Sequence, residues 1–290
     1  MNFHIPLMDS RISPVVFVLF VVFYFLQRRR LRPINLPTLN HTILNFTVAI
    51  PSGILLRLAI LPAGLFVAGW SAQSGFGLLH WIRLPAWMEM IAGFLLLDLT
   101  FYYWHIMNHK LALFWRFHNV HHIDLDLDVS TAFRFHFMEM VFSIGFRSLQ
   151  VAFLGVTPLL FLVFEGIFQA ATEFHHSNWR LPFQMERLLV RIIVTPRMHG
   201  IHHSIVQNET DSNFSTIFSF WDRLHRTIRL NIPQQEITIG VPAYLDPSYQ
   251  RLIVLLWLPF RKQKEYWLRD DGTRPARLEI SMESRQTLVA

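Results

Sequence analysis

The chain has 290 residues, of which 52% are hydrophobic and 16% are charged, and its formal net charge is +6. This composition is too apolar for an ordinary soluble domain, so membrane-spanning helices are the first expectation. Cysteine is absent, which excludes disulfides, thiolate catalysis and cysteine-held metal clusters. Any metal must therefore bind imidazole or oxygen ligands.

Several apolar stretches approach the roughly 20 residues that a membrane span requires. Residues 12–27 form a short uncharged run, 46–70 form a longer run interrupted by Arg57, and 87–105 form a third. Residues 137–173 predict a hairpin or a long pair of helices. We therefore predict an all-α, multi-span membrane protein with about four to five transmembrane or membrane-embedded helices.

The basic residues indicate the orientation of these spans. Arg28, Arg29, Arg30 and Arg32 follow the first apolar run. The positive-inside rule then places residues 28–44 in the cytoplasm. The alternative, a signal peptide over 12–27, would need its positive residues before the apolar run and a small-residue cleavage pattern after it. The excess positive charge matches loops facing anionic lipid, and we expect no nucleic-acid partner.

Eleven of the 15 histidines lie between residues 105 and 203. By the predicted topology, they sit at the cytoplasmic ends of spans, in a helical cap. Three motifs, "HIMNH", "HNVHH" and "HGIHH", space their histidines so that residues three and four apart share a helix face. The eight histidines are His105, His109, His118, His121, His122, His199, His202 and His203. Eight imidazoles exceed the ligands of one zinc site, so the pattern predicts two metal ions. Iron, zinc, copper and nickel all suit imidazole.

Further histidines have less distinctive surroundings. His136 precedes Glu139 by three residues, so His136 is either a ligand oriented by Glu139 or simply its partner. In the pair at 175 and 176, we favour His176 as a ligand and expect His175 beside the ligands or at the surface. We expect His225 at the surface, with an additional ligand as the alternative. His4, His41 and His80 lie far from the cluster and are expected to be ordinary.

Polar side chains should orient the ligands, because a metal-bound imidazole usually donates its other N–H to a carboxylate or carbonyl. Asp98 lies two helical turns before His105, and an ionisable residue inside a span suggests a role. A polar contact between helices is its alternative reading. Glu139, Asn178 and Asp222 are further candidates.

Beyond these residues, the chain resembles the fatty acid hydroxylase and sterol desaturase superfamily of integral-membrane di-iron enzymes. "DLTFYYWHIMNH", "LFWRFHNVHHID" and "TPRMHGIHHS" resemble its three histidine boxes in order and spacing. "RFHFMEM", "FHHSN" and residues 210–227 resemble shorter elements around them. The chain departs from the family where Phe137 replaces a common Pro, Ser215 replaces a Gly, and His225 and Arg226 replace a Phe-Gly pair. These departures concern the substrate and a local turn more than the metal site.

The resemblance covers about 85–245, which we expect to be the catalytic domain. Residues 1–84 would form N-terminal membrane helices with a cytoplasmic linker, and 246–290 a cytoplasmic tail. The resemblance implies two iron ions, O2 as cosubstrate, and oxidation of a C–H bond of a membrane lipid. The electrons would come from a separate reductase or carrier docked on the basic cytoplasmic face. The implied iron ligands are His105, His109, His118, His121, His122, His136, His176, His199, His202 and His203.

Two other functions remain open from the sequence. A zinc-dependent membrane hydrolase would have about three protein ligands and a catalytic glutamate, as in H-E-x-x-H, and that motif is absent. A metal transporter or metal-binding protein would place its ligands near the bilayer midplane. The sequence does not identify the lipid, nor does it separate hydroxylation from desaturation.

Overall fold

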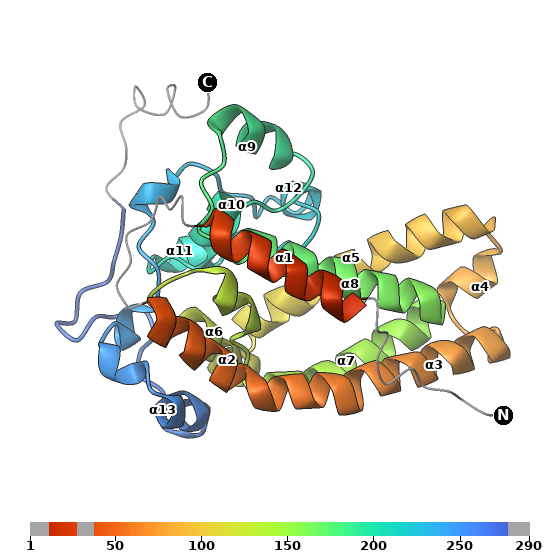
Figure 1. Cartoon of the computed structure of the whole chain (residues 1–290), viewed down its shortest axis with the longest axis horizontal. Coiled ribbons are helices and arrows are strands. Elements are labelled where there is room, and N and C mark those ends of the chain that lie inside the picture. Colours follow the sequence, from red (N-terminus) through yellow and green to blue (C-terminus); the bar gives the residue numbers. More distant parts are fainter. Residues whose placement is uncertain (1–11, 28–37, 278–290) are drawn as a thin grey trace.

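The computed structural model describes residues 12–27 and 38–277. Every regular element in these ranges is a helix, and the extended pairing within them is limited to two isolated bridges, Ile193 with Phe218 and Ser204 with Ile239. The all-α prediction is confirmed. Figure 1 shows long helices extending from one side and short helices gathered at the other. The arginine cluster at 28–32 lies outside the described residues.

The N-terminal part contains a longer rod than the sequence predicted. Helices α2 (Thr38–Leu55) and α3 (Leu61–Ser74) join through a π-helical turn, η1 (Leu56–Ile60). The 18, 5 and 14 residues of these elements form one rod of roughly 55 Å at 1.5 Å per residue. The predicted span at 46–70 was therefore too short at both ends. The π turn, closed by the Leu61 N–H on the Leu56 carbonyl, shifts the hydrogen-bond register just before Pro62, which lacks an N–H of its own.

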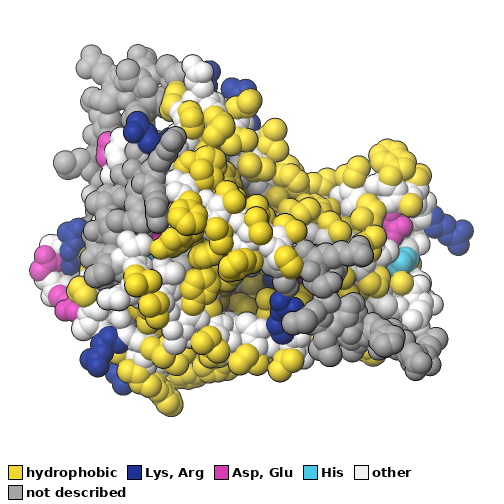
Figure 2. Space-filling view, in the orientation of Figure 1, with side chains coloured by type: hydrophobic (Ala, Val, Ile, Leu, Met, Phe, Trp, Pro, Cys, Tyr) yellow, Lys and Arg dark blue, Asp and Glu magenta, His cyan; other side chains and the backbone are white. Residues whose placement is uncertain are grey.

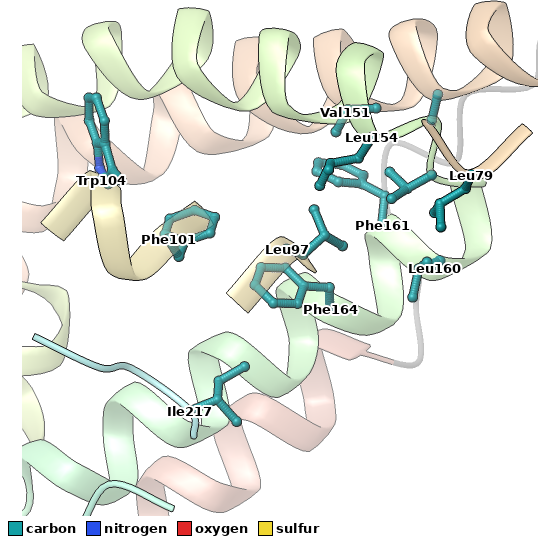
Figure 3. Packing of buried hydrophobic residues seen from close by; sticks show 12 residues of the cluster. Leu79, Leu97, Phe101, Trp104, Val151, Leu154, Leu160, Phe161, Phe164 and Ile217 are labelled. Atoms are coloured by element: carbon teal, nitrogen blue, oxygen red, sulfur yellow. The ribbon is translucent and has the colours of Figure 1, made fainter. Parts of the chain in front are cut away.

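Four further helices complete the long-helix bundle. Helix α1 (Ile12–Leu26) packs along α8 (Pro158–His176), while α5 (Ala86–Lys110) and α7 (Phe137–Leu154) lie beside them. The short helix α4 (Leu78–Ile82) connects α3 to α5 at the end farthest from the short helices. A buried cluster that includes Leu97, Phe101 and Phe164 fills the space between α5, α7 and α8 (Figure 3).

The outer surface of the bundle is apolar. Leu58, Phe66 and Leu159 are each more than 60% exposed, and Figure 2 shows hydrophobic side chains over most of one face, around a hollow. Three segments of the described chain are long and apolar enough to cross a membrane: Thr38–Ile82, Ala86–Lys110 and Phe137–Leu154. With the shorter apolar helix at Pro14–Leu26, they confirm a multi-span helical membrane protein.

The short elements form a cap at one end of the bundle. They include α6 (Ala112–His122), η2 (Val129–Phe133), α9 (Phe183–Leu189), α10 (Pro196–His202), α11 (Gln207–Thr210) and α12 (Phe220–Leu224). The turns η3 (Gln234–Glu236), η4 (Pro242–Tyr244), η5 (Pro247–Tyr249) and η6 (Leu258–Phe260) follow, with α13 (Leu252–Trp257) before η6. Leu255 and Leu258 pack in one buried cluster with Val48 and Trp115. The described part of the predicted C-terminal tail is therefore part of the cap, packed against α2 and α6.

A buried polar network that includes His41 fastens α2 to the cap. His41 Nε2 lies 2.7 Å from Asp124 Oδ1, Asn45 donates to Asp124 Oδ2 at 3.3 Å, and Arg134 forms a longer ion pair with the same carboxylate at 3.6 Å. Burial alone would raise the pKa of Asp124, but the charges of His41 and Arg134 reverse this and lower the pKa below its ordinary value. His41 is therefore a buried structural residue.

Candidate metal centre

Five of the predicted histidines form a first group. His105 and His109 lie on the last turns of α5, His118 and His122 lie one helical turn apart on α6, and His202 comes from α10. One ligand nitrogen from each of them lies within 4.8 Å of all the others. Because α6 begins two residues after α5 ends, the first two histidine motifs fold back on each other.

Four other histidines form a second group: His121, His176, His199 and His203. Their Nε2 atoms follow one another at short distances, with 3.0 Å from His121 to His176, 3.0 Å from His176 to His199, and 3.1 Å from His199 to His203. The two groups adjoin, since the rings of His122 and His203 stack with centroids 4.2 Å apart.

The two HxxHH motifs divide their histidines between the groups by the same rule. In each motif the first and last histidines, four residues apart, join one group, and the middle histidine joins the other. His118 and His122 thus belong to the first group and His121 to the second, whereas His199 and His203 belong to the second and His202 to the first. Each motif therefore links both groups.

The chemistry of both groups fits metal ions. The Nε2 atoms of His109, His118, His122 and His202 are buried without a hydrogen-bond partner, an arrangement that is costly unless another group satisfies them. Burial, reinforced by the neighbouring imidazoles, lowers the pKa values of the cap histidines His121, His122, His199, His202 and His203 well below the ordinary value. These rings are thus neutral near pH 7, the form that binds a metal.

Backbone carbonyls of one short segment, residues 212–216, orient three of the histidines. His202, His105 and His175 each direct Nδ1 to a carbonyl, that of Ser212 at 2.7 Å, Phe214 at 2.8 Å and Thr216 at 3.1 Å respectively. The three carbonyls belong to alternate residues of the segment 212–216, and all three accept from histidines. This arrangement leaves the Nε2 atoms of His105 and His202 for a metal. These hydrogen bonds could not be predicted from the sequence, because every residue has a backbone carbonyl.

Two predicted carboxylates act on this segment and do not contact the histidines. Asp222 accepts hydrogen bonds from the N–H groups of Phe214 and Ser215, both at 2.9 Å. Asp98 accepts from the N–H groups of Ile217 and Phe218 and, at 2.8 Å, from Trp221 Nε1. Asp98 and Asp222 therefore position the histidines through the intervening backbone.

The other two polar candidates have different outcomes. His118 Nδ1 donates to Glu139 Oε1 at 3.0 Å, and both side chains are buried, so Glu139 does orient a histidine of the first group. Asn178 accepts a long hydrogen bond, at 3.4 Å, from Gln234.

The remaining histidines lie outside both groups. His136 is the N-cap of α7, because its Nδ1 accepts from the Met138 N–H at 3.1 Å. Its Nε2 donates to the Leu256 carbonyl at 3.2 Å. With both nitrogens engaged, His136 has none left for a metal, and the prediction that it is a ligand is corrected. His175 is buried beside the second group. His225 is half-buried and bonds to Trp221 and Tyr103.

A cavity of about 550 Å³ connects the histidines to the bundle. At one end it is lined by His105, His118, His121, His176 and His199. Its walls come mainly from apolar side chains of α1, α2, α3, α5, α7 and α8. The two histidine groups thus face a space suited to hydrocarbon.

The fold and the site define a multi-span helical membrane protein with a histidine-rich centre at one end of an apolar cavity. Comparison with known proteins shows a similarity to one family. The fatty acid hydroxylase family matches residues 90–227, which contain both histidine groups. This match supports the resemblance to the fatty acid hydroxylase and sterol desaturase superfamily. No solved structure matches the chain significantly.

Several curated proteins are similar to this chain. Human cholesterol 25-hydroxylase is 30% identical over 184 residues, which cover 57% of this chain and 62% of that protein. The ornithine lipid hydroxylase OlsE of Rhizobium tropici is 29% identical over 169 residues, covering 57% and 49%. Alkylglycerol monooxygenase of Xenopus tropicalis is 28% identical over 177 residues, covering 58% and 37%. The chain thus spans less than two thirds of the length of these relatives.

Proposed function

We propose that this protein is a membrane-bound di-iron oxidoreductase that uses O2 and external electrons to hydroxylate a C–H bond of a lipid. The observation that carries the proposal is the position of two adjoining groups of histidines, most of them buried, at the end of an apolar cavity. Names of the similar proteins, which are lipid hydroxylases and monooxygenases, favour hydroxylation over desaturation.

Each group of histidines would hold one iron ion. The first ligand set is His105, His109, His118, His122 and His202, and the second is His121, His176, His199 and His203. When bound, the iron pair would supply the activation of O2 that C–H oxidation requires. The overall reaction consumes O2, two electrons and two protons, and it yields the alcohol and water.

The protein's own residues would position the ligands and exclude water. The carbonyls of residues 212 and 214 and the Glu139 carboxylate fix Nδ1 of His202, His105 and His118, which leaves the opposite ring nitrogen as donor. The apolar walls would hold a hydrocarbon chain with its end against the histidines and keep bulk water from the site. A zinc hydrolase would instead need an open path for water and a carboxylate base free of ligand contacts.

We place the metal centre on the cytoplasmic side, by the positive-inside reading of the arginines after the first apolar run. The electron carrier would dock on the cap. Arg187 and Arg191, at α9, and Arg223 and Arg226, at α12, are exposed, and Arg223 bonds to the Val190 carbonyl at the end of α9, so the two helices share one basic surface. An acidic carrier would complement it. Raising the salt concentration should then slow reduction by such a carrier more than reduction by a small uncharged reductant.

The decisive test is metal analysis joined to turnover. Protein purified in detergent with iron and zinc both available should contain about two irons per chain, and it should consume O2 when given reductant and a lipid extract. His121→Ala and His202→Ala, one from each group, should lose metal and activity. His80→Ala, at α4 on the far end of the bundle, is the matched control and should keep both. Two zinc ions, with no O2 consumption after iron reconstitution, would refute the proposal.

A further inference from the structure

An ion pair lies in the wall of the apolar cavity, away from the histidines. Arg147 of α7 and Glu165 of α8 both line the cavity, and their side chains are 9% and 12% exposed. Arg147 Nη1 donates to Glu165 Oε1. Charged residues at this depth in a membrane bundle are costly and usually serve a function. The proposed reaction does not use either of them.

The pair is held in one geometry by its neighbours. Arg147 Nε donates to Ser143 Oγ at 3.1 Å, and its guanidinium lies 4.5 Å from the ring centre of Phe101 and 5.5 Å from that of Phe168. A planar guanidinium packed on aromatic rings loses little further freedom on binding a ligand.

Hydrogen-bonding capacity remains on both sides of the pair. Within the described part of the chain, Arg147 Nη2 and Glu165 Oε2 have no hydrogen-bond partner from the protein. The first is a donor and the second an acceptor. A hydroxyl group can accept from one and donate to the other. An anionic group would meet the Glu165 carboxylate, and a pure hydrocarbon would leave both atoms unsatisfied.

The distance from the pair to the histidines follows from the two helices. On α7, Arg147 lies eight residues after Glu139, which bonds to His118, so the separation along the helix is about 12 Å. On α8, Glu165 lies eleven residues before His176, or about 16 Å. Both helices therefore place the ion pair about 12–16 Å from the histidines. An extended hydrocarbon segment of a lipid can bridge that distance.

We propose that Arg147 and Glu165 bind the hydroxyl group of a neutral amphipathic lipid and thereby set which carbon of its hydrocarbon part reaches the histidines. The selection of the oxidised carbon rests on the proposed function, because only turnover reveals which carbon is oxidised. The first half, selective binding of a hydroxyl, stands on the cavity alone.

The test measures binding without turnover. The probes are cholesterol and a 1-alkylglycerol, each paired with its O-methylated analogue, and cholesterol sulfate serves as the anionic arm. Displacement of a fluorescent sterol, read by energy transfer from tryptophan, reports binding to protein in detergent. Trp104 lines the cavity and is a suitable donor. The wild-type protein should bind at least one of the two hydroxyl lipids about tenfold to a hundredfold more tightly than its methylated analogue, the range expected for hydrogen bonds to charged groups.

The variants separate anchoring from folding. Glu165→Gln alone leaves a buried arginine uncompensated and risks misfolding, whereas replacing both partners of a buried pair with apolar residues is often tolerated. Arg147→Met with Glu165→Met should therefore keep the wild-type melting temperature and metal content, yet lose the preference for the hydroxyl lipid. Leu159→Ala, on the exposed side of α8, is the control and should keep it.

The outcomes are distinct for the two proposals. No preference for either hydroxyl lipid in the wild type, tighter binding of the sulfate, or an unchanged preference in the folded double variant would each overturn the anchoring role. Preferential binding without any oxidised product would leave the anchor standing and count against the proposed oxidation. With turnover, the double variant should give products oxidised at several carbons where the wild type oxidises one.

Discussion

The contact between Glu139 and His118 gives the sharpest test of how the metal centre is held. Glu139→Ala removes the acceptor that fixes His118 Nδ1 at 3.0 Å, in a place where both side chains are at most 5% exposed. Water has little room to replace the lost oxygen. Loss of such a partner typically lowers metal affinity 10- to 100-fold, which corresponds to about 1.4–2.7 kcal/mol.

The assay is metal retention during a timed challenge with a chelator. Since His118 belongs to the first histidine group alone, Glu139→Ala should release one of the two proposed metal ions faster than wild type, while the ion held by the second group is released at the wild-type rate. Glu139→Gln keeps an oxygen that accepts from His118 and should lose less than about tenfold. Equal release rates in Glu139→Ala and wild type would refute the reasoning.

Three further predictions concern positions around the site and the bundle. His136→Asn should keep both metal ions, because the structure uses His136 as a helix cap; metal loss in the folded variant would restore His136 as a ligand. Asp222→Ala should lower the melting temperature, because it removes the acceptor of two buried N–H groups, each worth about 1–3 kcal/mol. Asp222→Asn should have a smaller effect. An unchanged melting temperature in Asp222→Ala would contradict the role assigned to that carboxylate. Gly77→Ala should cost at least about 2 kcal/mol in a denaturant or thermal titration, because its φ is +118° and a Cβ would lie 2.4 Å from Gly155 Cα; Gly145→Ala, which has open space, is its control and should be nearly neutral.

Local spacing was enough to predict which histidines converge. Residues four apart on a helix share a face whatever surrounds the helix, and each such pair lies in one group; with His176, nine of the ten predicted ligands lie in the two groups. The division between groups was not predictable, because it depends on how α6 and α10 face each other. His136 differed from the prediction for the same reason: its spacing to Glu139 fits a ligand, but its nitrogens meet Met138 and Leu256.

Long-range polar contacts were the least predictable part of the fold. His41 lies 83 residues from Asp124, and nothing in its sequence neighbourhood distinguishes it from a surface histidine. The length of the α2–α3 rod was also underestimated, because polar residues at 38–45 and 71–74 lower the hydropathy at its two ends. By contrast, Arg147 and Glu165 stand out in the sequence, because charged residues within an apolar stretch such as 137–173 suggest a functional role.

The position of the centre follows from how the cap is attached to the bundle. Residues 212–218 present their carbonyls to histidines on one side, and their N–H groups are held by two carboxylates from different places. Asp222 belongs to the cap, whereas Asp98 lies on the long helix α5 and holds the same segment at residues 217 and 218. The membrane helices therefore control the orientation of the cap ligands directly. Because α5 also contributes His105, His109 and the cavity wall at Phe101 and Trp104, any shift of that helix would move the ligands and the substrate space together, which keeps their relative geometry constant.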